Sequence, residues 1–248
     1  NITGTAAEIV AAHDNGELGT IDGDFTATVT GTAAATDLTA IAAATSGTIT
    51  ASGVTNITGT AAEIVAAHDN GELTSIDGDF TTTVTGTAAA TDLTAIAAAT
   101  SGTITASGVT TITGTATAIM AAHDDSSELS SIDGDFAATV TGTATEDELS
   151  ALNAATSGAI DASGVTAITS GTAADVAALI SDGTVTLASD VDVTVTGTAA
   201  ATDLTSIATA TSGTITASGV TTITGTAAEI VAAHDNGELT SIDGDFEA

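Results

Sequence analysis

The sequence predicts an α/β repeat protein, a solenoid in which short strand-helix-strand coils stack on one another. Three observations predict this fold class. The 248-residue chain repeats itself with a period of 55 residues, and each repeat alternates Thr-rich with Ala-rich segments. Apolar residues make up 43% of the chain, although only four residues are aromatic. Because a small coil of this kind cannot bury its own apolar face, it has to stack on its neighbours.

Two alternating segments make up each repeat. The first, ITGTAAEIVAAHDNGEL, starts at Ile2, Ile57 and Ile223, with variants at Ile112 and Ile168. The second, VTGTAAATDLTAIAAATSGTITASGVT, starts at Val29 and Val84, with variants at Val140 and Val195. We expect one array over residues 1–248, cut from a longer chain. Its repeats are 2–56, 57–111, 112–167, 168–222 and a partial copy at 223–248.

Each half-repeat is predicted to open with a strand. In TTTVTG, Val84 alternates with Thr83 and Thr85, as expected of a half-buried strand. A second strand, in TSIDGDF or in GTITASGV, is predicted to close each coil. The alternative architecture is an all-β parallel β-helix.

The Ala-rich stretch between the strands is predicted to be a helix. Thr60 and Glu63 have the spacing of a capping box, in which the Thr hydroxyl and the Glu carboxylate each accept from the other's backbone amide. The same spacing occurs at Thr5/Glu8, Thr226/Glu229 and Thr143/Glu146. The second segment has an apolar stripe at Leu93, Ile96 and Ala97.

Strand and helix spacing conflict in such a stack. Parallel strands lie about 4.8 Å apart, whereas packed helices need roughly 8–10 Å. Curvature with all helices on one side resolves the conflict, and so does placing the two helix types on different sides. The 55-residue pairing favours the second arrangement.

Composition excludes several functions. The chain has 32 acidic residues and no Lys or Arg, so we expect it to bind neither nucleic acid nor an anionic membrane surface. No apolar run approaches the length of a membrane span, and membrane insertion is not expected. Acidity and abundant Thr favour an extracellular or cell-surface location.

Acidic pairs recur in the motif SIDGDF and its near-copies. They are Asp22/Asp24, Asp77/Asp79, Asp133/Asp135 and Asp243/Asp245. The simpler interpretation is a turn between two strands, with Ile76 and Phe80 pointing inward. The alternative is a calcium site, because carboxylate oxygens suit this ion. One pair offers too few ligands, so calcium would need further ligands from another coil, water or a second chain. The fourth repeat breaks the pattern and offers Asp190 and Asp192 instead.

Histidine recurs at one position, before an Asp at a helix end. The four copies are His13, His68, His123 and His234. The negative end of the helix dipole favours a protonated His there, and metal binding is the weaker alternative. Because every Ser, His and Asp recurs without a singular cluster, we do not expect an enzyme, unless a pocket forms at the diverged unit 168–194.

Threonine pairs such as Thr48/Thr50 and Thr103/Thr105 suggest ladders across the coils. A solvent-facing strand explains them through β-propensity. Ice binding, the alternative, requires a long unbroken ladder, which Ala159 and Asp161 interrupt in the third copy.

The segments GTAAEIVAAHDNGELTSIDGDF and VTGTAAATDLTAIAAATSGTITASGVT resemble those of very large, repeat-rich bacterial surface and secreted proteins, including cyanobacterial ones. The resemblance implies an extracellular structural or adhesive role, in a filament, sheath or surface layer. We therefore expect a self-associating structural protein whose association calcium assists, with a calcium-dependent adhesin or an ice-binding solenoid as the alternatives. No other cofactor is expected.

Overall fold

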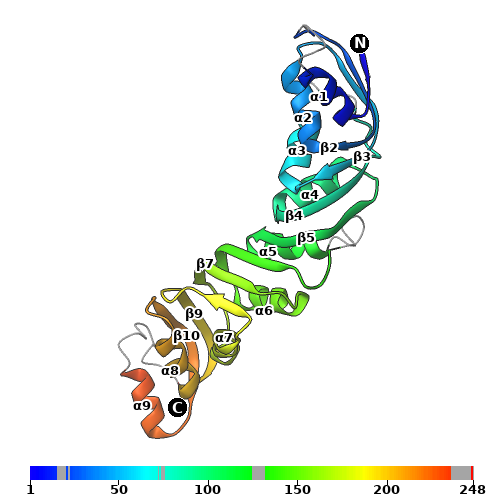
Figure 1. The fold of residues 1–248 in the computed structure, drawn as a ribbon. Coiled ribbons are helices and arrows are strands. Elements are labelled where there is room, and N and C mark those ends of the chain that lie inside the picture. Colours follow the sequence, from blue (N-terminus) through cyan, green and yellow to red (C-terminus); the bar gives the residue numbers. More distant parts are fainter. Residues whose placement is uncertain are drawn as a thin grey trace. The chain divides into compact units, whose positions relative to one another are not determined.

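The computed structural model describes residues 1–15, 21, 23–71, 73, 76–124, 132–235 and 247. The described strands are β1 (Ile2–Gly4), β2 (Ala27–Ala34), β3 (Ile49–Gly59), β4 (Thr81–Ala89), β5 (Ile104–Gly114), β6 (Ala137–Ala144), β7 (Ile160–Ile168), β8 (Val185–Leu187), β9 (Asp192–Ala200) and β10 (Ile215–Thr224). The described helices are α1 (Ala6–Asp14), α2 (Ala35–Ala44), α3 (Ala61–His68), α4 (Ala90–Ala99), α5 (Ala116–Asp124), α6 (Glu146–Ala155), α7 (Ala173–Ser181), α8 (Ala201–Ala210) and α9 (Ala227–His234). They form two compact units, unit 1 with residues 1–112 and 121–133, and unit 2 with residues 113–120 and 134–248 (Figure 1).

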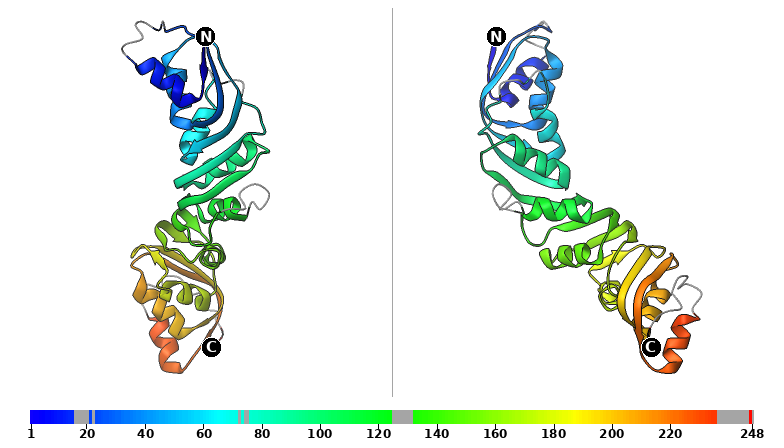
Figure 2. Two further views of the ribbon diagram at one scale, coloured as in Figure 1. Left: turned by 45° about the vertical axis from the view of Figure 1, so that its right-hand side comes forward. Right: turned by 180° about the vertical axis from the view of Figure 1, so that it is seen from behind.

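Unit 1 is a parallel sheet with one layer of helices. The strand order is β1-β2-β3-β4-β5, and a helix connects each strand to the next. The helices α1 to α4 pack consecutively and cover one face of the sheet (Figure 2). Crossovers between neighbouring parallel strands generally have one hand, so successive crossovers in one direction along the sheet return the chain on the same face. The prediction that the two helix types lie on different sides is therefore wrong, and so is the all-β alternative.

Unit 2 repeats this arrangement. Its strands are parallel in the order β6-β7-β9-β10, and β8 pairs with β7 beside this path. The helices α6 to α9 again pack consecutively. Both units thus have an α/β repeat fold, in which parallel strands alternate with helices.

The strand register explains why two half-repeats form one period. Strand β3 pairs with β2 along residues 49–58, but with β4 only along residues 56–59. Thr82 on β4 is the counterpart of Ala27 on β2, one repeat later. Thr82 pairs with Ile57 on β3, and Ile57 in turn pairs with Ala33 on β2. Since Ala33 is six residues beyond Ala27 (33 − 27), each repeat advances about 20 Å along the strands.

The register of unit 2 gives the same advance. Val193 lies opposite Ile168, which lies opposite Ala144, and Ala144 is six residues beyond Ala138 (144 − 138). With about 9.6 Å across two strands, equivalent points of successive repeats are about 22 Å apart. That distance leaves room for two helices at roughly 8–10 Å each, so the stepped register removes the conflict between strand and helix spacing.

The predicted coil differs from the observed one at its closing strand. GTITASGV does not end a coil, because it continues into the next opening segment as the single strand β3. Gly53 sits at a register shift within this strand instead of in a turn. In the motif TSIDGDF, residues 76–80 form a turn and no strand. Apart from the half-repeat that contains the short strand β8, each described half-repeat therefore contributes one strand and one helix.

The helix starts follow the sequence with one exception. The capping boxes at Thr5/Glu8, Thr60/Glu63 and Thr226/Glu229 are all formed. In α6 the box is Thr145/Glu148 instead of Thr143/Glu146. Starting the helix two residues later turns Leu149 and Leu152 into the core, where both are fully buried. Glu146, expected to cap, is buried beside Ser150, whose hydroxyl donates to it.

The core lies between the sheet and the helices and is built from small side chains. The predicted stripe Leu93, Ile96 and Ala97 is buried, as are Ile64 and Val84. In the part of the chain that the structure describes, no helix is both long and apolar enough to cross a bilayer.

Candidate functional site

The corner before β4 is held by hydrogen bonds from the following half-repeat. The Thr100 hydroxyl donates to the Phe80 carbonyl and accepts from the Gly102 amide at 2.9 Å. The Ser101 amide and hydroxyl both donate to the Gly78 carbonyl, at 2.8 and 3.2 Å. We call the residues Thr100, Ser101 and Gly102, and their counterparts in other repeats, the Thr-Ser-Gly clamp.

The same clamp closes the other corners. Its copies are residues 45–47, 156–158 and 211–213. Their threonine hydroxyls donate to the carbonyls of Phe25, Phe136 and Val191 respectively. The recurring signal was visible in the sequence, since Thr-Ser-Gly follows each corner at a fixed distance of 20 residues (100 − 80). The sequence analysis did not identify the Thr-Ser-Gly residues, because it considered only the acidic motif, which forms the other side of the contact.

Glycine is required at the end of each clamp. A Cβ at Gly102 would lie 2.2 Å from the Phe80 carbonyl oxygen and 2.6 Å from that of Asp79. The same clash would arise at Gly47, Gly158 and Gly213. By contrast, Gly78 within the turn has nothing within 4 Å of an added Cβ. The clamp therefore depends on close backbone approach, and the turn itself does not.

The predicted acidic pairs point into solvent. Asp24, Asp77, Asp79, Asp133 and Asp135 are all exposed. Asp22, Asp243 and Asp245 lie outside the described residues. Among the described residues, no three His, Asp or Glu side chains are grouped so that they could hold a metal ion. As expected for a turn, Phe80 and Phe136 are buried, while Ile76 is only half-buried.

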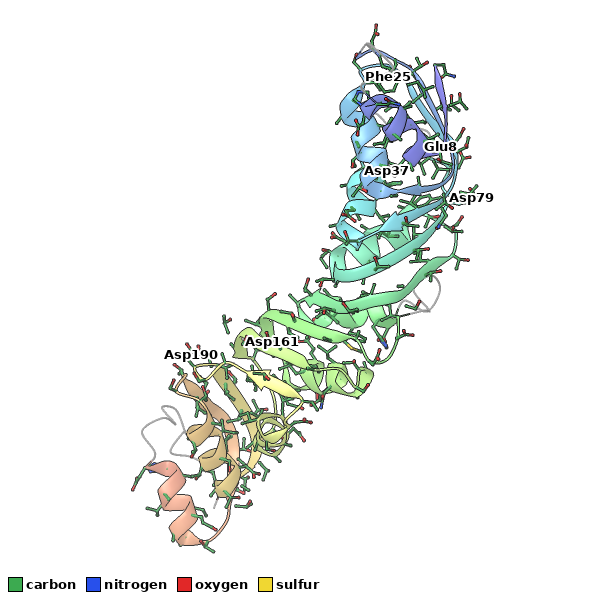
Figure 3. The ribbon with its side chains drawn as sticks, in the orientation of Figure 1. Glu8, Phe25, Asp37, Asp79, Asp161 and Asp190 are labelled. Carbon is green, nitrogen blue, oxygen red and sulfur yellow. The ribbon has the colours of Figure 1, made fainter. Side chains whose placement is uncertain are left out.

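The diverged fourth repeat keeps the corner without the acidic pair. Thr211 donates to Val191 at 2.6 Å, and Ser212 donates to the Ser189 carbonyl through its amide and its hydroxyl. Val191 thus occupies the position of Phe80, so Asp190 corresponds to Asp79, and the place of Asp77 is taken by Ala188. Figure 3 labels Asp79 and Asp190, the acidic residues that both corners share. Asp192, which the sequence suggested as the second member of the pair, instead accepts from the Thr214 amide at 2.7 Å.

The recurring histidines pair with the aspartate that follows them. The distance from Nδ1 of His68 to Oδ1 of Asp69 is 3.0 Å, and the ring lies over Phe80 with centroids 5.8 Å apart. His13 has the same relation to Asp14 and Phe25. His13 and His68 thus each pack against the corner ring at the end of their helix, which is a packing role.

The cavities near the corners differ in size. The one beside His13 and Phe25 is about 310 Å³ and the one beside His68 and Phe80 about 20 Å³, whereas the one beside Val191 in the diverged repeat is about 260 Å³. The latter is lined by Ile180 in the place of His68, and no described lining residue is an acid or a base. Its two hydroxyl-bearing residues, Ser189 and Thr211, belong to the corner contact.

Threonine rows cross the exposed face of the sheet, but they are short. Thr3, Thr28 and Thr50 are in register on β1, β2 and β3. The row ends there, because β4 pairs with β3 only from Asn56 onward. In unit 2, Asp161 lies in register between Thr139 and Thr186. The long unbroken ladder that ice binding requires is therefore not formed in the described strands.

The carboxylates with a lowered pKa are held by hydroxyl and amide donors. Contacts with Thr5 lower the pKa of Glu8, and contacts with Thr226 lower that of Glu229, in both cases through the capping box. The Thr117 hydroxyl, followed by the Thr145 amide, lowers the pKa of Glu148. These acids stabilise helix starts and do not belong to the corner pairs.

No protein-family model, curated protein or solved structure matches the chain.

Proposed function

We propose that the chain is a structural segment of an extracellular fibre, sheath or surface layer, built as a solenoid. Its function is to supply length and a repeated contact surface. Identical units present identical contacts at fixed intervals, which is the requirement for ordered polymerisation. The resemblance to large bacterial surface proteins supports the same class.

One observation carries this proposal. The feature that recurs in every described corner is an internal backbone contact, namely the hydrogen bond that the clamp threonine donates to the carbonyl of residue 25, 80, 136 or 191. The exposed residues around the corner vary, as the loss of the acidic pair at residues 188–190 shows. A binding or catalytic protein preserves a particular exposed site, whereas a structural repeat preserves the scaffold.

Calcium acts between chains in this proposal. Each exposed pair, such as Asp77 and Asp79, supplies two carboxylates, while calcium takes about six to eight oxygen ligands. With no Lys or Arg in the chain, two acidic surfaces repel each other unless cations lie between them. Calcium is therefore expected to strengthen association without changing the fold of a single chain.

Electron microscopy with calcium and with a chelator tests the proposal. We expect ordered assemblies of the wild-type chain, larger in calcium. The variant D77N/D79N/D133N/D135N removes two of the four acidic pairs and should lose much of the calcium effect, while the control D37N/D92N/D147N/D203N, with equal charge change on helices, should keep it. Dispersed single particles under all conditions would refute the structural role, and assemblies indifferent to chelation would refute the part assigned to calcium.

A further inference from the structure

We propose that the exposed sheet face of unit 1 is the surface through which one copy of the chain contacts a second copy. This inference rests on the proposed structural function and names the face that carries it. The face is formed by the outward residues of β1 to β5, on the side of the sheet that α1 to α4 do not cover (Figures 1 and 2).

The first observation is the bare face itself. Parallel sheets occur almost only with both faces covered, because their strands are usually apolar on both sides. Here the buried residues of β3 are Ile49, Ala51, Val54 and Ile57, and the residues between them are exposed or half-buried Thr, Ser, Gly and Asn. One face of this parallel sheet therefore lacks the layer of helices that usually covers it.

The second observation is where the charge lies. The chain carries 32 acidic residues, yet none of them is in β1, β2, β3, β4 or β5. The acids of unit 1 lie in its helices and in the segments between its elements. On a chain with a formal charge of −32, this uncharged face is the place where a like-charged copy approaches with the least repulsion.

The chemistry of the face favours a second copy over other partners. Hydroxyls both donate and accept, so an array of Thr and Ser is complementary to itself. A cationic partner would be drawn to the acidic helices and corners. Carbohydrates usually stack on exposed aromatic rings, but the chain has no Trp or Tyr, and none of its four Phe lies in β1 to β5.

The contacts on this face show that its hydroxyls pair across strands. The Thr81 hydroxyl on β4 lies 3.0 Å from both the Thr55 carbonyl and the Asn56 side-chain oxygen on β3. The methyl groups of Thr remain available for contact with another face. Five strands with about eight residues each present about 600 Å² per partner. A pair of copies would bury about 1,200 Å², the lower limit of specific interfaces, so association should strengthen with the number of repeats.

Unit 2 provides the matched change for a test. Asp161 occupies on β7 the position that Thr50 occupies on β3 and Thr105 on β5, and it is exposed. An aspartate is thus compatible with the strand at this position. The double variant T50D/T105D places the same charge on the face of unit 1. The control T36D/T91D adds two equal charges at exposed positions of α2 and α4.

Sedimentation velocity over a range of concentrations, in calcium-free buffer near 0.15 M salt, measures the effect. We expect the wild-type chain and T36D/T91D to associate alike, and T50D/T105D to require at least tenfold higher concentration. Circular dichroism checks that each variant keeps its fold.

The outcomes separate this inference from the proposed function. If the wild type associates and T50D/T105D associates equally well, the sheet face is not the contact, although the structural role stands. Equal weakening of T50D/T105D and T36D/T91D would show a general charge effect and also overturn the inference. A wild type that stays monomeric at all concentrations, with and without calcium, overturns both. Thermal hysteresis that T50D/T105D abolishes, without association, would assign the face to ice.

Discussion

The corners at residues 76–80 and 187–191 have different sequences and the same backbone contacts. The regular corner reads IDGDF and the diverged one LASDV, so one aspartate, the glycine and the aromatic ring are all replaced. The Thr-Ser-Gly clamp nevertheless reaches the equivalent carbonyls in both. The packing beside these two corners differs, since the adjacent cavity is about 20 Å³ at the first and about 260 Å³ at the second, although the regular corner at Phe25 has a cavity of about 310 Å³. The comparison shows that the repeats keep the backbone contact of the clamp. The acidic pair and the aromatic ring can be replaced without loss of that contact.

The largest expected effect comes from breaking the clamp by bulk. Gly102→Ala places a Cβ 2.2 Å from the Phe80 carbonyl oxygen, where only backbone movement can relieve the clash. We expect the free energy of unfolding to fall by about 3 kcal/mol or more, at the upper end of overpacking. Gly213→Ala in the diverged corner should cost a similar amount. Gly78→Ala is the control, and a loss as large as that of Gly102→Ala would contradict the account. Urea unfolding followed by circular dichroism measures all three.

The next effect comes from removing the clamp hydroxyl. Thr100→Val keeps the shape of a buried side chain but removes the donor to Phe80 and the acceptor for Gly102. We expect a loss of about 2 kcal/mol, from two hydrogen bonds at about 1 kcal/mol each. Thr211→Val should lose as much, because the diverged corner has the same bonds. Thr50→Val on the exposed strand is the control, and a marked difference between the two corners in urea unfolding would show that they are not equivalent.

Exchanging the corner residues should sharpen the comparison of packing. Phe80→Val removes a ring that is 2% exposed, and we expect a loss of about 2 kcal/mol through the cavity it leaves. Val191→Phe should be neutral or stabilising by up to about 1 kcal/mol, because the adjacent cavity can hold the ring. Thermal unfolding of the two variants checks the signs. A strongly destabilised Val191→Phe would mean that the diverged corner excludes the ring for another reason.

The smallest effect concerns the capping carboxylates of the two units. Glu8 and Glu148 cap their helices alike, but Glu148 also accepts from Thr117. The pKa of both is lowered, so each stabilises the fold above its ordinary pKa of about 4.3 and loses this contribution as the pH falls through the lowered value. Thr117→Val should raise the pKa of Glu148 towards its ordinary value and leave that of Glu8 unchanged. A side-chain NMR titration measures both, and an unchanged Glu148 would contradict the assigned cause.

Much of the fold could be predicted from the sequence, because internal repetition and capping spacing are local signals. Three of the four proposed capping boxes are formed as predicted. The fourth failed because Thr143 and Thr145 both have a Glu three residues later, and only the position of the core leucines decides between them. The sequence did not predict that GTITASGV and the next opening segment form the single strand β3. Ser52 and Gly53 are residues typical of a turn, but here they lie at a register shift within the strand.

The site was harder to predict than the fold. The turn at Asp77 and Gly78 could be inferred from residue preferences, but the clamp joins it to residues about 20 positions away. Such a contact depends on which strands are neighbours, and local sequence does not contain that information. The six-residue advance of each repeat along the strands could not be predicted for the same reason, since it follows from the pairing between strands of successive half-repeats.

Backbone amide hydrogen exchange in a dispersed chain, with calcium and with a chelator, tests most directly whether the corner is a clamp instead of an ion site. The amides to compare are those of Gly102, Gly158 and Gly213, each of which donates to its clamp threonine. The account predicts similar protection at all three positions and no change with calcium. Protection that rises with calcium at Gly102 and Gly158, but not at Gly213, would contradict it, because only the first two corners carry the acidic pair.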